Sequence, residues 1–379
     1  MSEISFSIIT VCLNAEKQIR KTIESVLSQT YNGTIEYIII DGESTDGTTE
    51  IVKEYIDRLG VFISEKDTGI YNAINKGIRL AHGDIIGILN SGDWYEENTL
   101  QLVADAAAKG TEDILYGTTR KWDGATEKGC FDIYPLEKFW YLMAFPHPST
   151  FVRRSCYDKY GLFDESYRIA ADYKWLLGSY LEGATFRQIE AVLTNFMLDG
   201  VSETRLVETV TEARRVSFGY AEKFEVPDGI DALERYYEKA LRNAKAREMR
   251  RYHEDITCDI INEAFPNKVD IVVWGACDGV GDVIDLLARA GHHVVGLVDN
   301  NPSKAGTEML GLPVSSPEAG LRDGNNGVFI FVTGHDLEIE RQISEMDVFN
   351  GDYMTLDQLK AELVNFYDME NTCVDGGQS

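Results

Sequence analysis

Carboxylate side chains stand in three short turns in the first hundred residues, and each turn comes shortly after a run of apolar residues. Asp41 follows the run YIII, Asp67 follows VFIS, and Asp93 follows DIIGIL. A carboxylate at a strand end can accept hydrogen bonds from a nucleotide base or ribose, and one in a tight Ser-Gly-Asp turn can bind a hard divalent cation through oxygen. Such a cation would neutralise a diphosphate and stabilise it as a leaving group.

The segments that position these turns alternate between short apolar runs and longer amphipathic stretches. We predict strands at 5–11, 36–40, 61–64 and 84–89 and helices between and after them at 15–28, 48–59, 71–81 and 97–108. Such a pattern is typical of parallel strands buried on both faces, and ligands of these sheets bind at the carboxyl ends of the strands. The three turns are therefore expected on one edge, although each alone is also a common structural turn former.

The pattern changes after about residue 200. Residues 202–264 form a long charged helical stretch that is interrupted by VPDG at 226–229, and a second strand-turn-helix series begins at 269–275. We predict an α/β domain at 1–200, a helical extension and connector at 201–266, a smaller α/β domain at 267–370 and a loose tail at 371–379.

Composition agrees with two domains and excludes several classes of protein. The chain has 379 residues, 44% of them apolar, and a formal net charge of −27, so two cores can form and a general attraction for nucleic acid is not expected. Its six cysteines show no C-x-x-C spacing, which favours a reduced, cytoplasmic protein. We expect neither a signal peptide nor a membrane span, because the N-terminus has no basic region and the apolar runs are far shorter than about 18 residues.

Six segments in a fixed order resemble the family 2 glycosyltransferases with the GT-A fold. They are SIITVCLN at 7–14, IDGESTDG at 40–47, EKDTGIY at 65–71, LNSGDW at 89–94, HPSTF at 147–151 and GLFDESYRIAADY at 161–173. The resemblance covers about half of the chain. It implies an α/β fold with a GT-A nucleotide-binding domain and a mainly parallel, mixed sheet.

The resemblance implies a nucleotide-sugar site at the strand ends. Asp41 would contact the base, and Gly69 would leave room for the nucleotide beside Asp67. The residues expected at this site are Thr10, Val11, Asn14, Asp41, Asp67 and Gly69.

Four further residues receive roles in the reaction from the resemblance. Asp93 would be the metal ligand, and Asp172 would be the general base that deprotonates the acceptor hydroxyl. His147 and Trp94 are expected on the acceptor side. For His147 the alternative is a histidine that fixes its loop, and for Trp94 the expectation rests on stacking against a sugar.

The metal turn and the base motif depart from the family's common pattern. Asn90 and Gly92 stand where many members have acids, and Ala171 precedes Asp172 where a glutamate is common. We still expect Mn²⁺ or Mg²⁺, because a sugar-diphosphate leaving group must be neutralised and this turn has no arginine or lysine.

The second α/β domain resembles the small Rossmann-like modules found beside sugar-modifying enzymes. Gly275 and Gly279 follow its first predicted strand, and Asp299 ends the next strand at the spacing of a ribose-binding acid. Cys277 and Val280 stand where a dinucleotide fingerprint would have glycines. A second nucleotide site at Gly275, Gly279 and Asp299 and a scaffold or assembly module are both open.

Seven basic side chains lie between residues 235 and 251. One interpretation is a peripheral contact with the inner face of a membrane that carries a lipid-linked acceptor. The other is a solvated helix face that pairs with the surplus acids of the chain. The oligomeric state is not encoded in any pattern that we can read.

These patterns predict an inverting glycosyltransferase that moves a sugar from a nucleotide-diphosphate sugar, with a UDP-sugar favoured, to a glycan or lipid-linked acceptor. One alternative is a protein that binds or senses nucleotide sugars without turnover. A second is an NAD(P)-dependent, sugar-modifying oxidoreductase that acts through the C-terminal domain.

Overall fold

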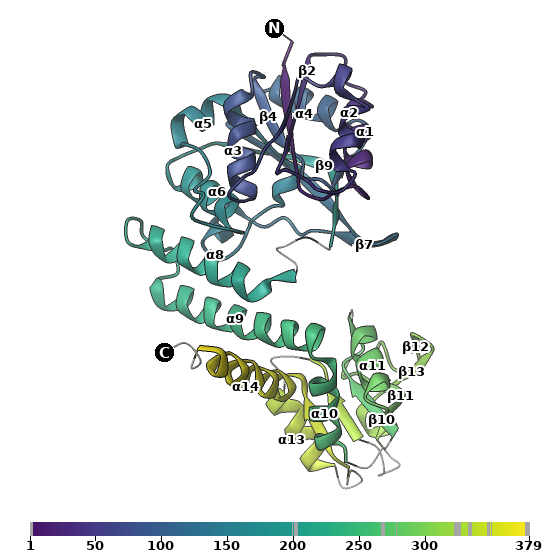
Figure 1. Ribbon diagram of the computed structural model, residues 1–379. Coiled ribbons are helices and arrows are strands. Elements are labelled where there is room, and N and C mark those ends of the chain that lie inside the picture. The colour runs from purple at the N-terminus through teal and green to yellow at the C-terminus, as the bar shows by residue number, and fades with distance from the viewer. Residues whose placement is uncertain are drawn as a thin grey trace. The chain divides into compact units, whose positions relative to one another are not determined.

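The computed structural model describes residues 3–198, 200, 204–266, 270–277, 279–321, 327–332, 336–346, 349 and 351–375. The chain forms two compact units, Met1–Tyr237 and Glu238–Ser379. Figure 1 shows that each unit contains its own sheet and helices. In these described ranges, the helices are too short or too polar to cross a bilayer.

The first unit is built on one mixed sheet with the strand order β3-β2-β1-β4-β8-β6-β9-β5, and β7 pairs with β6. Its strands are β1 Phe6–Cys12, β2 Ile35–Asp41, β3 Val61–Ser64, β4 Ile85–Ile88, β5 Trp94–Tyr95, β6 Ile114–Asp123, β7 Thr126–Cys130, β8 Thr150–Arg153 and β9 Phe186–Met197. Strands β1 to β4 pair in parallel, whereas β8 runs antiparallel to β4 and β6. The predicted mixed sheet is confirmed, with parallel pairing of its first four strands and mostly antiparallel pairing in its second half.

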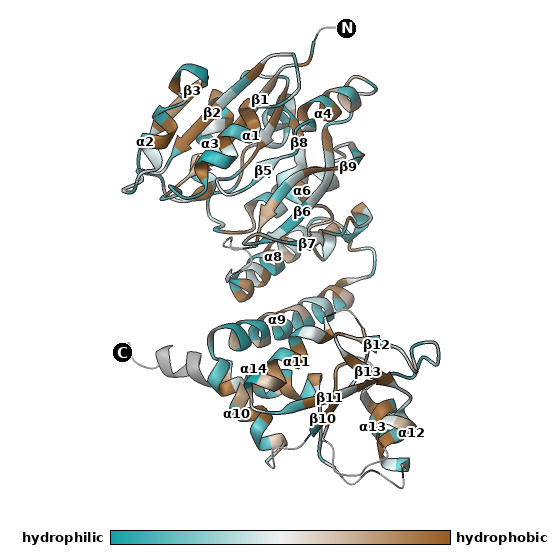
Figure 2. Ribbon diagram, turned by 90° about the vertical axis from the view of Figure 1, so that its right-hand side faces the viewer, coloured by the Kyte–Doolittle hydropathy of each residue, from teal (hydrophilic) through white to brown (hydrophobic). Residues whose placement is uncertain are grey.

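Alternate residues of the parallel strands enter two different cores. Ile9 and Ile38 face the core under α3 and α6, whereas Ile8 and Ile39 face the core under α1 and α4. Figure 2 shows these strands in brown between helices whose outer surfaces are teal. A strand that is apolar on both faces must be covered on both sides, which explains the layered α/β arrangement.

Helix α1 of the first unit packs on the sheet through one apolar face, whereas α6 is buried on most sides. In α1, the buried residues Ile19, Ile23 and Val26 recur at helical spacing. The helical segments are α1 Ile19–Leu27, α2 Thr48–Lys53, η1 Ile56–Arg58, α3 Ile70–Leu80, α4 Thr99–Ala107, η2 Leu136–Trp140, η3 His147–Ser149, α5 Arg154–Tyr160, α6 Ala171–Leu181 and α8 Leu206–Ala221. The first four strand-helix pairs thus follow the predicted order.

The predicted helical stretch after residue 200 is three helices in the described residues. They are α8, α9 (Ile230–Tyr252) and α10 (Glu254–Ala264). The predicted break at 226–229 separates α8 from α9, and a further break falls at His253. Helix α9 crosses the division between the two units.

The second unit contains a smaller sheet with the order β12-β13-β11-β10-β14-β15. All neighbours pair in parallel except β12 with β13, so five strands run in the order 3-2-1-4-5 of a doubly wound sheet. Its other elements are β10 Asp270–Trp274, α11 Val280–Arg289, β11 His293–Val298, β12 Glu308–Met309, β13 Leu312–Ser315, α12 Pro317–Gly320, β14 Gly327–Ile330, α13 Asp336–Glu345, β15 Tyr353–Thr355 and α14 Leu356–Asp375. Helix α14 continues into the segment 371–379, for which we predict a loose tail, and residues 376–379 lie outside the described residues.

Candidate active site

The register of the sheet brings the predicted site residues to one edge. Cys12 pairs with Asp41, and Asp41 pairs with Ser64 in the next strand, so β1, β2 and β3 end together. The antiparallel β8 begins at the same edge as β4 ends, because Gly87 pairs with Phe151. The segments that follow β1 to β4 and the one that precedes β8 therefore meet at this edge.

Asp41 is enclosed by its own loop. Its carboxylate accepts hydrogen bonds from the backbone N–H of Ser44 (3.0 Å), the hydroxyl of Ser44 (2.5 Å) and the hydroxyl of Ser64 (2.6 Å). The residue has no exposed surface. Asp41 thus fixes the loop after β2 in this structure, and its contact with a base stays a prediction.

Thr10, Val11 and Asn14 play different parts in the same region. Thr10 is buried and its hydroxyl shares a hydrogen bond with the Tyr37 hydroxyl (3.0 Å), and Val11 packs in the core. Asn14 adopts a left-handed conformation with φ of 50°. Its Oδ1 accepts a hydrogen bond from the N–H of Thr45 (2.9 Å) and joins the loops after β1 and β2.

Asp67 lies against the loop of Asp41. A Cβ added to Gly42 would stand 2.5 Å from Asp67 Oδ2, so the backbone at Gly42 has room for a hydrogen only. Asp67 Oδ1 accepts a hydrogen bond from the N–H of Gly69 (3.0 Å), and Gly69 has φ of 144° with open space around its Cβ position. Room for a nucleotide beside Asp67 stays a prediction.

The turn that carries Asp93 is held by α1 and β9. The hydroxyl of Thr22 donates to the Asp93 carbonyl (2.7 Å) and accepts from the N–H of Gly92 (3.1 Å). The N–H of Met197 donates to Asp93 Oδ1 (3.2 Å). Gly92 has φ of 105°, and a side chain there would overlap Gln18. The glycine that replaces an acid in this turn is therefore required by the backbone.

The oxygen atoms of this turn fit a hard divalent cation. Asn90 Oδ1 is buried without a hydrogen-bond partner, and Asn90 is joined to Asp93 by a backbone hydrogen bond of 3.1 Å. Among the residues that the structure describes, no three His, Cys, Asp or Glu side chains form a metal cluster. Mg²⁺ in phosphate-binding sites commonly takes one or two protein oxygens and fills its shell with phosphates and water, so Asp93 with Asn90 is a fitting pair of ligands.

Trp94 follows Asp93 in β5 and belongs to an aromatic pair. Its ring centroid is 5.7 Å from that of Trp122, and the Lys21 ammonium lies 2.9 Å from the Trp94 ring. Burial lowers the pKa of Lys21. The Trp122 indole donates to Asn195 Oδ1 (2.8 Å). Trp94 is therefore partly covered by the protein itself, and its acceptor-side role stays a prediction.

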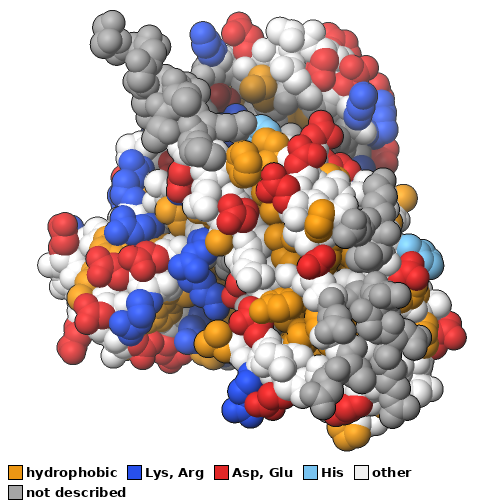
Figure 3. Space-filling model, turned by 90° about the horizontal axis from the view of Figure 1, so that it is seen from below, with side chains coloured by type: hydrophobic (Ala, Val, Ile, Leu, Met, Phe, Trp, Pro, Cys, Tyr) orange, Lys and Arg blue, Asp and Glu red, His pale blue; other side chains and the backbone are white. Residues whose placement is uncertain are grey.

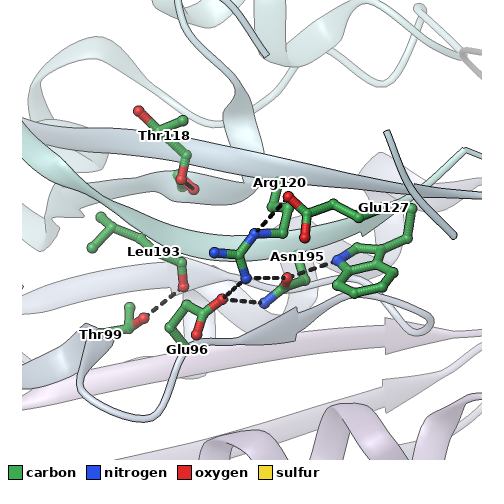
Figure 4. Close-up of polar contacts among 9 residues, drawn as sticks. Glu96, Thr99, Thr118, Arg120, Glu127, Leu193 and Asn195 are labelled. Atoms are coloured by element: carbon green, nitrogen blue, oxygen red, sulfur yellow. Dashed lines mark hydrogen bonds and ion pairs between the residues drawn. The ribbon is translucent and has the colours of Figure 1, made fainter. Parts of the chain in front are cut away.

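Polar side chains fasten the strands beside the metal turn. Figure 4 shows Arg120 on β6 between Glu96 and Glu127, at 2.7 and 3.5 Å, with Asn195 on β9 beside them. The Asn195 amide also donates to Glu96 (3.0 Å), and the Thr99 hydroxyl donates to the Leu193 carbonyl. These contacts tie β5, β6, β7 and β9 together directly after Asp93.

Asp172 lies in the first turn of α6 and meets two other side chains. Its Oδ1 accepts hydrogen bonds from the Tyr71 hydroxyl (2.9 Å) and from the N–H of Tyr173 (2.8 Å). Burial raises the pKa of Tyr71 well above its usual value, and the Asp172 charge raises it further. Burial lowers the pKa of the partly exposed His147, and Asp172 offsets part of that effect. The structure thus brings Asp172 and His147 close enough to interact, and burial disfavours the charged form of His147.

The loop before α6 is held by α3. The Glu165 carboxylate accepts hydrogen bonds from the side-chain amides of Asn72 (2.9 Å) and Asn75 (2.8 Å). Asn75 also bonds the carbonyl and the N–H of Phe163. Sequence reasoning assigned no role to Tyr71 or Thr22, although both contact the predicted site; Tyr71 stood within a motif, whereas nothing in the sequence distinguished Thr22.

The residues predicted as a second nucleotide site lie at one edge of the smaller sheet. Asp299 Oδ2 accepts hydrogen bonds from the N–H of Ala276 (3.2 Å) and from Lys304 (2.9 Å). Burial alone would raise the pKa of Asp299, but the hydrogen bond from Lys304 and the backbone N–H groups lower it. Gly275 and Gly279 have φ of 122° and 87°. Asp299 is thus paired within the chain, and the ligand of this edge stays a prediction.

Part of the basic stretch at 235–251 pairs with acids. Lys245 contacts Asp368 at 2.5 Å, and burial lowers the pKa of Arg250. Figure 3 shows acidic and basic side chains on the same face of the molecule, with apolar side chains among them. The interpretation of a helix face that pairs with the surplus acids holds for Lys245.

Comparison with known proteins assigns the family. Residues 7–151 match Glycosyl transferase family 2. An uncharacterised glycosyltransferase of Mycobacterium tuberculosis is 32% identical over 205 residues, which are 52% of this chain and 77% of that protein. A PGL/p-HBAD biosynthesis glycosyltransferase of Mycobacterium bovis is 30% identical over 184 residues, or 46% of this chain and 68% of that protein.

A solved structure assigns the fold. The crystal structure of S. aureus TarS 1-349 in complex with UDP-GlcNAc is similar with a TM-score of 0.50 and 17% identity, over 69% of this chain and 78% of that chain. The predicted GT-A fold is confirmed by the mixed sheet and this likeness. The chain belongs to glycosyl transferase family 2, and the predicted enzyme class, a glycosyltransferase, is confirmed.

Proposed function

We propose that the chain transfers a sugar, with inversion, from a nucleotide-diphosphate sugar to a hydroxyl of a glycan or lipid-linked acceptor. Asp172 takes the proton of the acceptor hydroxyl while the acceptor oxygen forms a bond to the anomeric carbon. The bond from that carbon to the diphosphate oxygen breaks, and its electron pair leaves with the nucleoside diphosphate. Attack from the face opposite the leaving group gives inversion.

The observation that carries this proposal is the placement of Asp172. Its carboxylate lies beside Tyr71 and His147 at the edge of the sheet that also carries the Asp93 turn. A divalent cation, Mn²⁺ or Mg²⁺, held by Asp93 and Asn90 would neutralise the diphosphate. A base on one side of the donor and a cation on the other are what an in-line displacement of a diphosphate needs.

A uridine donor is favoured over other nucleotides. The TarS structure was determined with UDP-GlcNAc, and the edge formed by Asp67, Gly69 and the loop of Asp41 offers hydrogen-bond groups with open space at Gly69. The glycan or lipid-linked acceptor is supported by the resemblance of the sequence motifs to this family. Peripheral contact with a membrane belongs to the same proposal and depends on that acceptor.

The experiment measures release of nucleoside diphosphate by the full-length chain from UDP-glucose, UDP-galactose, UDP-GlcNAc and GDP-mannose, each with Mn²⁺, Mg²⁺ or EDTA. We expect one UDP-sugar to be used best, and EDTA to abolish release. Asp93→Asn and Asp172→Asn should each reduce turnover by about 10²- to 10⁴-fold, because each removes a charge on which the transfer depends. NMR of the product should show the inverted anomer.

An exposed acid supplies the matched control. The Asp105 carboxylate on α4 accepts a hydrogen bond from the nearby Gln101 side chain (2.8 Å) and lies in none of the loops of the proposed site, so Asp105→Asn should retain wild-type turnover. Wild-type turnover by Asp172→Asn would refute the assignment of the base. Full activity in EDTA would refute the cation, and a retained anomer would refute the direct displacement.

A further inference from the structure

Tyr71 connects Asp172 to a second acceptor. Its hydroxyl lies 2.9 Å from Asp172 Oδ1 and also within hydrogen-bond distance of the Ile169 carbonyl. A tyrosine has one hydroxyl hydrogen, so it donates to one of these two oxygens at a time. The side chain is buried, with 7% of its surface exposed, so bulk water does not compete freely for this hydrogen.

The position of the Ile169 carbonyl is fixed from α8. Glu212 on α8 accepts hydrogen bonds from three consecutive backbone N–H groups, those of Arg168 (2.9 Å), Ile169 (2.8 Å) and Ala170 (2.9 Å). These groups immediately precede α6, whose first turn contains Asp172. A carboxylate that accepts several backbone N–H bonds makes strong, charge-assisted contacts. Glu212 therefore sets the conformation of the segment from which both the Ile169 carbonyl and Asp172 project.

Other contacts hold α8 in place on this segment. Arg215 donates to the Ser166 carbonyl (3.2 Å), and its guanidinium stacks 3.8 Å from the Tyr167 ring centroid. Val216 is buried in the same core as α6. Helix α8 thus packs through its side chains against the segment that precedes α6. Within this contact, Glu212 accepts the hydrogen bonds from the N–H groups next to α6.

The Tyr71 hydroxyl has one acceptor for each protonation state of Asp172: Asp172 itself when it is ionised, and the Ile169 carbonyl when Asp172 is protonated. While Asp172 is ionised, the Tyr71 hydroxyl donates to Asp172 Oδ1. After Asp172 has taken the acceptor proton, it becomes a donor itself, and rotation of the Tyr71 hydroxyl about its C–O bond turns the hydrogen to the Ile169 carbonyl. Tyr71 Oη can then accept from the protonated Asp172. The Tyr71 hydroxyl and Asp172 are thus hydrogen-bonded to each other in both states, and no net proton is gained or lost by Tyr71.

We propose that Tyr71 and Glu212 are positioning residues for Asp172, and that α8 is thereby part of the catalytic unit. Glu212 fixes the Ile169 carbonyl, and that carbonyl and Asp172 together fix the Tyr71 hydroxyl. The proposal rests on the proposed function of Asp172 as the base. His147 also interacts with Asp172, and burial lowers the pKa of the His147 imidazole, which disfavours a positive charge beside the base.

The test measures nucleoside diphosphate release by the full-length chain from UDP-GlcNAc, or from whichever of the four donors is used best. We expect Tyr71→Phe and Glu212→Gln each to lower kcat about 10- to 100-fold, the range for a hydrogen bond to a charged group. The donor KM should stay within about twofold, because neither residue is placed at the donor. In the plot of kcat/KM against pH, the decline toward low pH should begin at a higher pH in Tyr71→Phe, because the ionised Asp172 carboxylate loses a hydrogen-bond donor.

Matched controls separate positioning from folding. Tyr55→Phe removes a hydroxyl that bonds an exposed carboxylate, that of Glu24 (2.8 Å), and Glu208→Gln changes a glutamate one turn earlier on α8 that pairs with Arg205 (3.3 Å). Both should behave as wild type. If Glu212→Gln does not fold, Glu212→Asp, which keeps the charge on a shorter side chain, is used and should retain more activity than Tyr71→Phe.

The outcomes distinguish this proposal from the one on which it rests. Wild-type kcat and pH profile in Tyr71→Phe, with Asp172→Asn inactive, would overturn the positioning role and leave the base assignment intact. An active Asp172→Asn would overturn both. A loss in Tyr71→Phe that appears only in the donor KM would also overturn the positioning role, because it would place Tyr71 in donor binding.

Discussion

Replacing Thr22 by valine tests how α1 supports the metal turn. Valine has nearly the same shape, so the substitution removes the hydroxyl and leaves the packing of a fully buried residue in place. The hydroxyl donates to the Asp93 carbonyl (2.7 Å) and accepts from the N–H of Gly92 (3.1 Å). Both partners lie in buried residues, so Thr22→Val removes one hydrogen bond from a buried acceptor and one from a buried donor.

The expected loss of stability in Thr22→Val follows from the two hydrogen bonds to the Asp93 carbonyl and the Gly92 N–H. Loss of a hydrogen bond to a buried group costs about 1–3 kcal/mol, so removal of two should lower the free energy of unfolding of the first unit by about 2–4 kcal/mol, with some relaxation of the turn. For a unit of this size, 1 kcal/mol corresponds to about 2–4 °C in Tm, so the first transition should fall by roughly 5–15 °C. The orientation of Asp93 depends on the same turn, and loss of a group that orients a metal ligand typically weakens metal binding about 10- to 100-fold.

Two assays read out the two effects. A thermal melt followed by circular dichroism gives the transition temperature, and nucleoside diphosphate release at increasing Mn²⁺ gives the half-saturating metal concentration. Thr126→Val, at an exposed position of β7, is the control and should match wild type in both. If Thr22→Val keeps the wild-type melt and metal requirement, then the Thr22 hydroxyl does not hold the turn, and the orientation of Asp93 does not depend on α1.

Two further predictions concern loops around the site. Gly42→Ala should weaken UDP binding about tenfold, measured by calorimetry, because the added Cβ would stand 2.5 Å from Asp67 Oδ2 and displace it; Gly219→Ala, with open space at its Cβ position, should bind UDP normally. Lys174→Met should lower the free energy of unfolding by about 1 kcal/mol at pH 7. This value allows for the partial exposure of the Lys174–Asp164 ion pair to solvent. The hydrogen bond from Lys174 lowers the pKa of Asp164 to about 2, so this stabilisation is complete above the ordinary pKa of an aspartate and is lost as the pH falls toward about 2. Urea unfolding at pH 7 and at pH 2.5 should show the difference shrinking, and an equal difference at both values would contradict the ion-pair explanation.

The first half of the sheet was predictable because its information is local. The runs at 36–40 and 61–64 lie within β2 and β3, and the periodicity at 71–81 overlaps α3 with a shift of one residue. Each of these elements is defined by the alternation or spacing of its own apolar residues. The predicted metal turn likewise follows β4 directly.

The second half of the sheet was not predictable in the same way. Strand β6 begins with ILY and continues with the polar run TTRKWD, and its partner β9 lies more than 60 residues away in the sequence. Its stability comes from side chains such as Arg120 and Asn195 that meet only in the fold. The same holds for the site: Tyr71 and Asp172 are 101 residues apart, and Glu212 is 42 residues from Ala170. A single sequence contains no local pattern for such pairs.

The acids of the predicted site differ in what surrounds them, and this difference bears on the roles proposed for them. Asp41 has no exposed surface and accepts three hydrogen bonds from serine groups of its own and a neighbouring segment, so it is used to build the loop. The Asp93 N–H bonds the Asn90 carbonyl, and Asn90 Oδ1 is a buried oxygen without a hydrogen-bond partner that a cation would satisfy. Asp172 is partly exposed and bonds a hydroxyl that has a second acceptor, so a change in its charge can be accommodated. Because Asp172 is partly exposed, whereas Asp41 and Asp93 are buried, it is the one of these three acids that an acceptor hydroxyl reaches most easily, which supports its proposed role as the base.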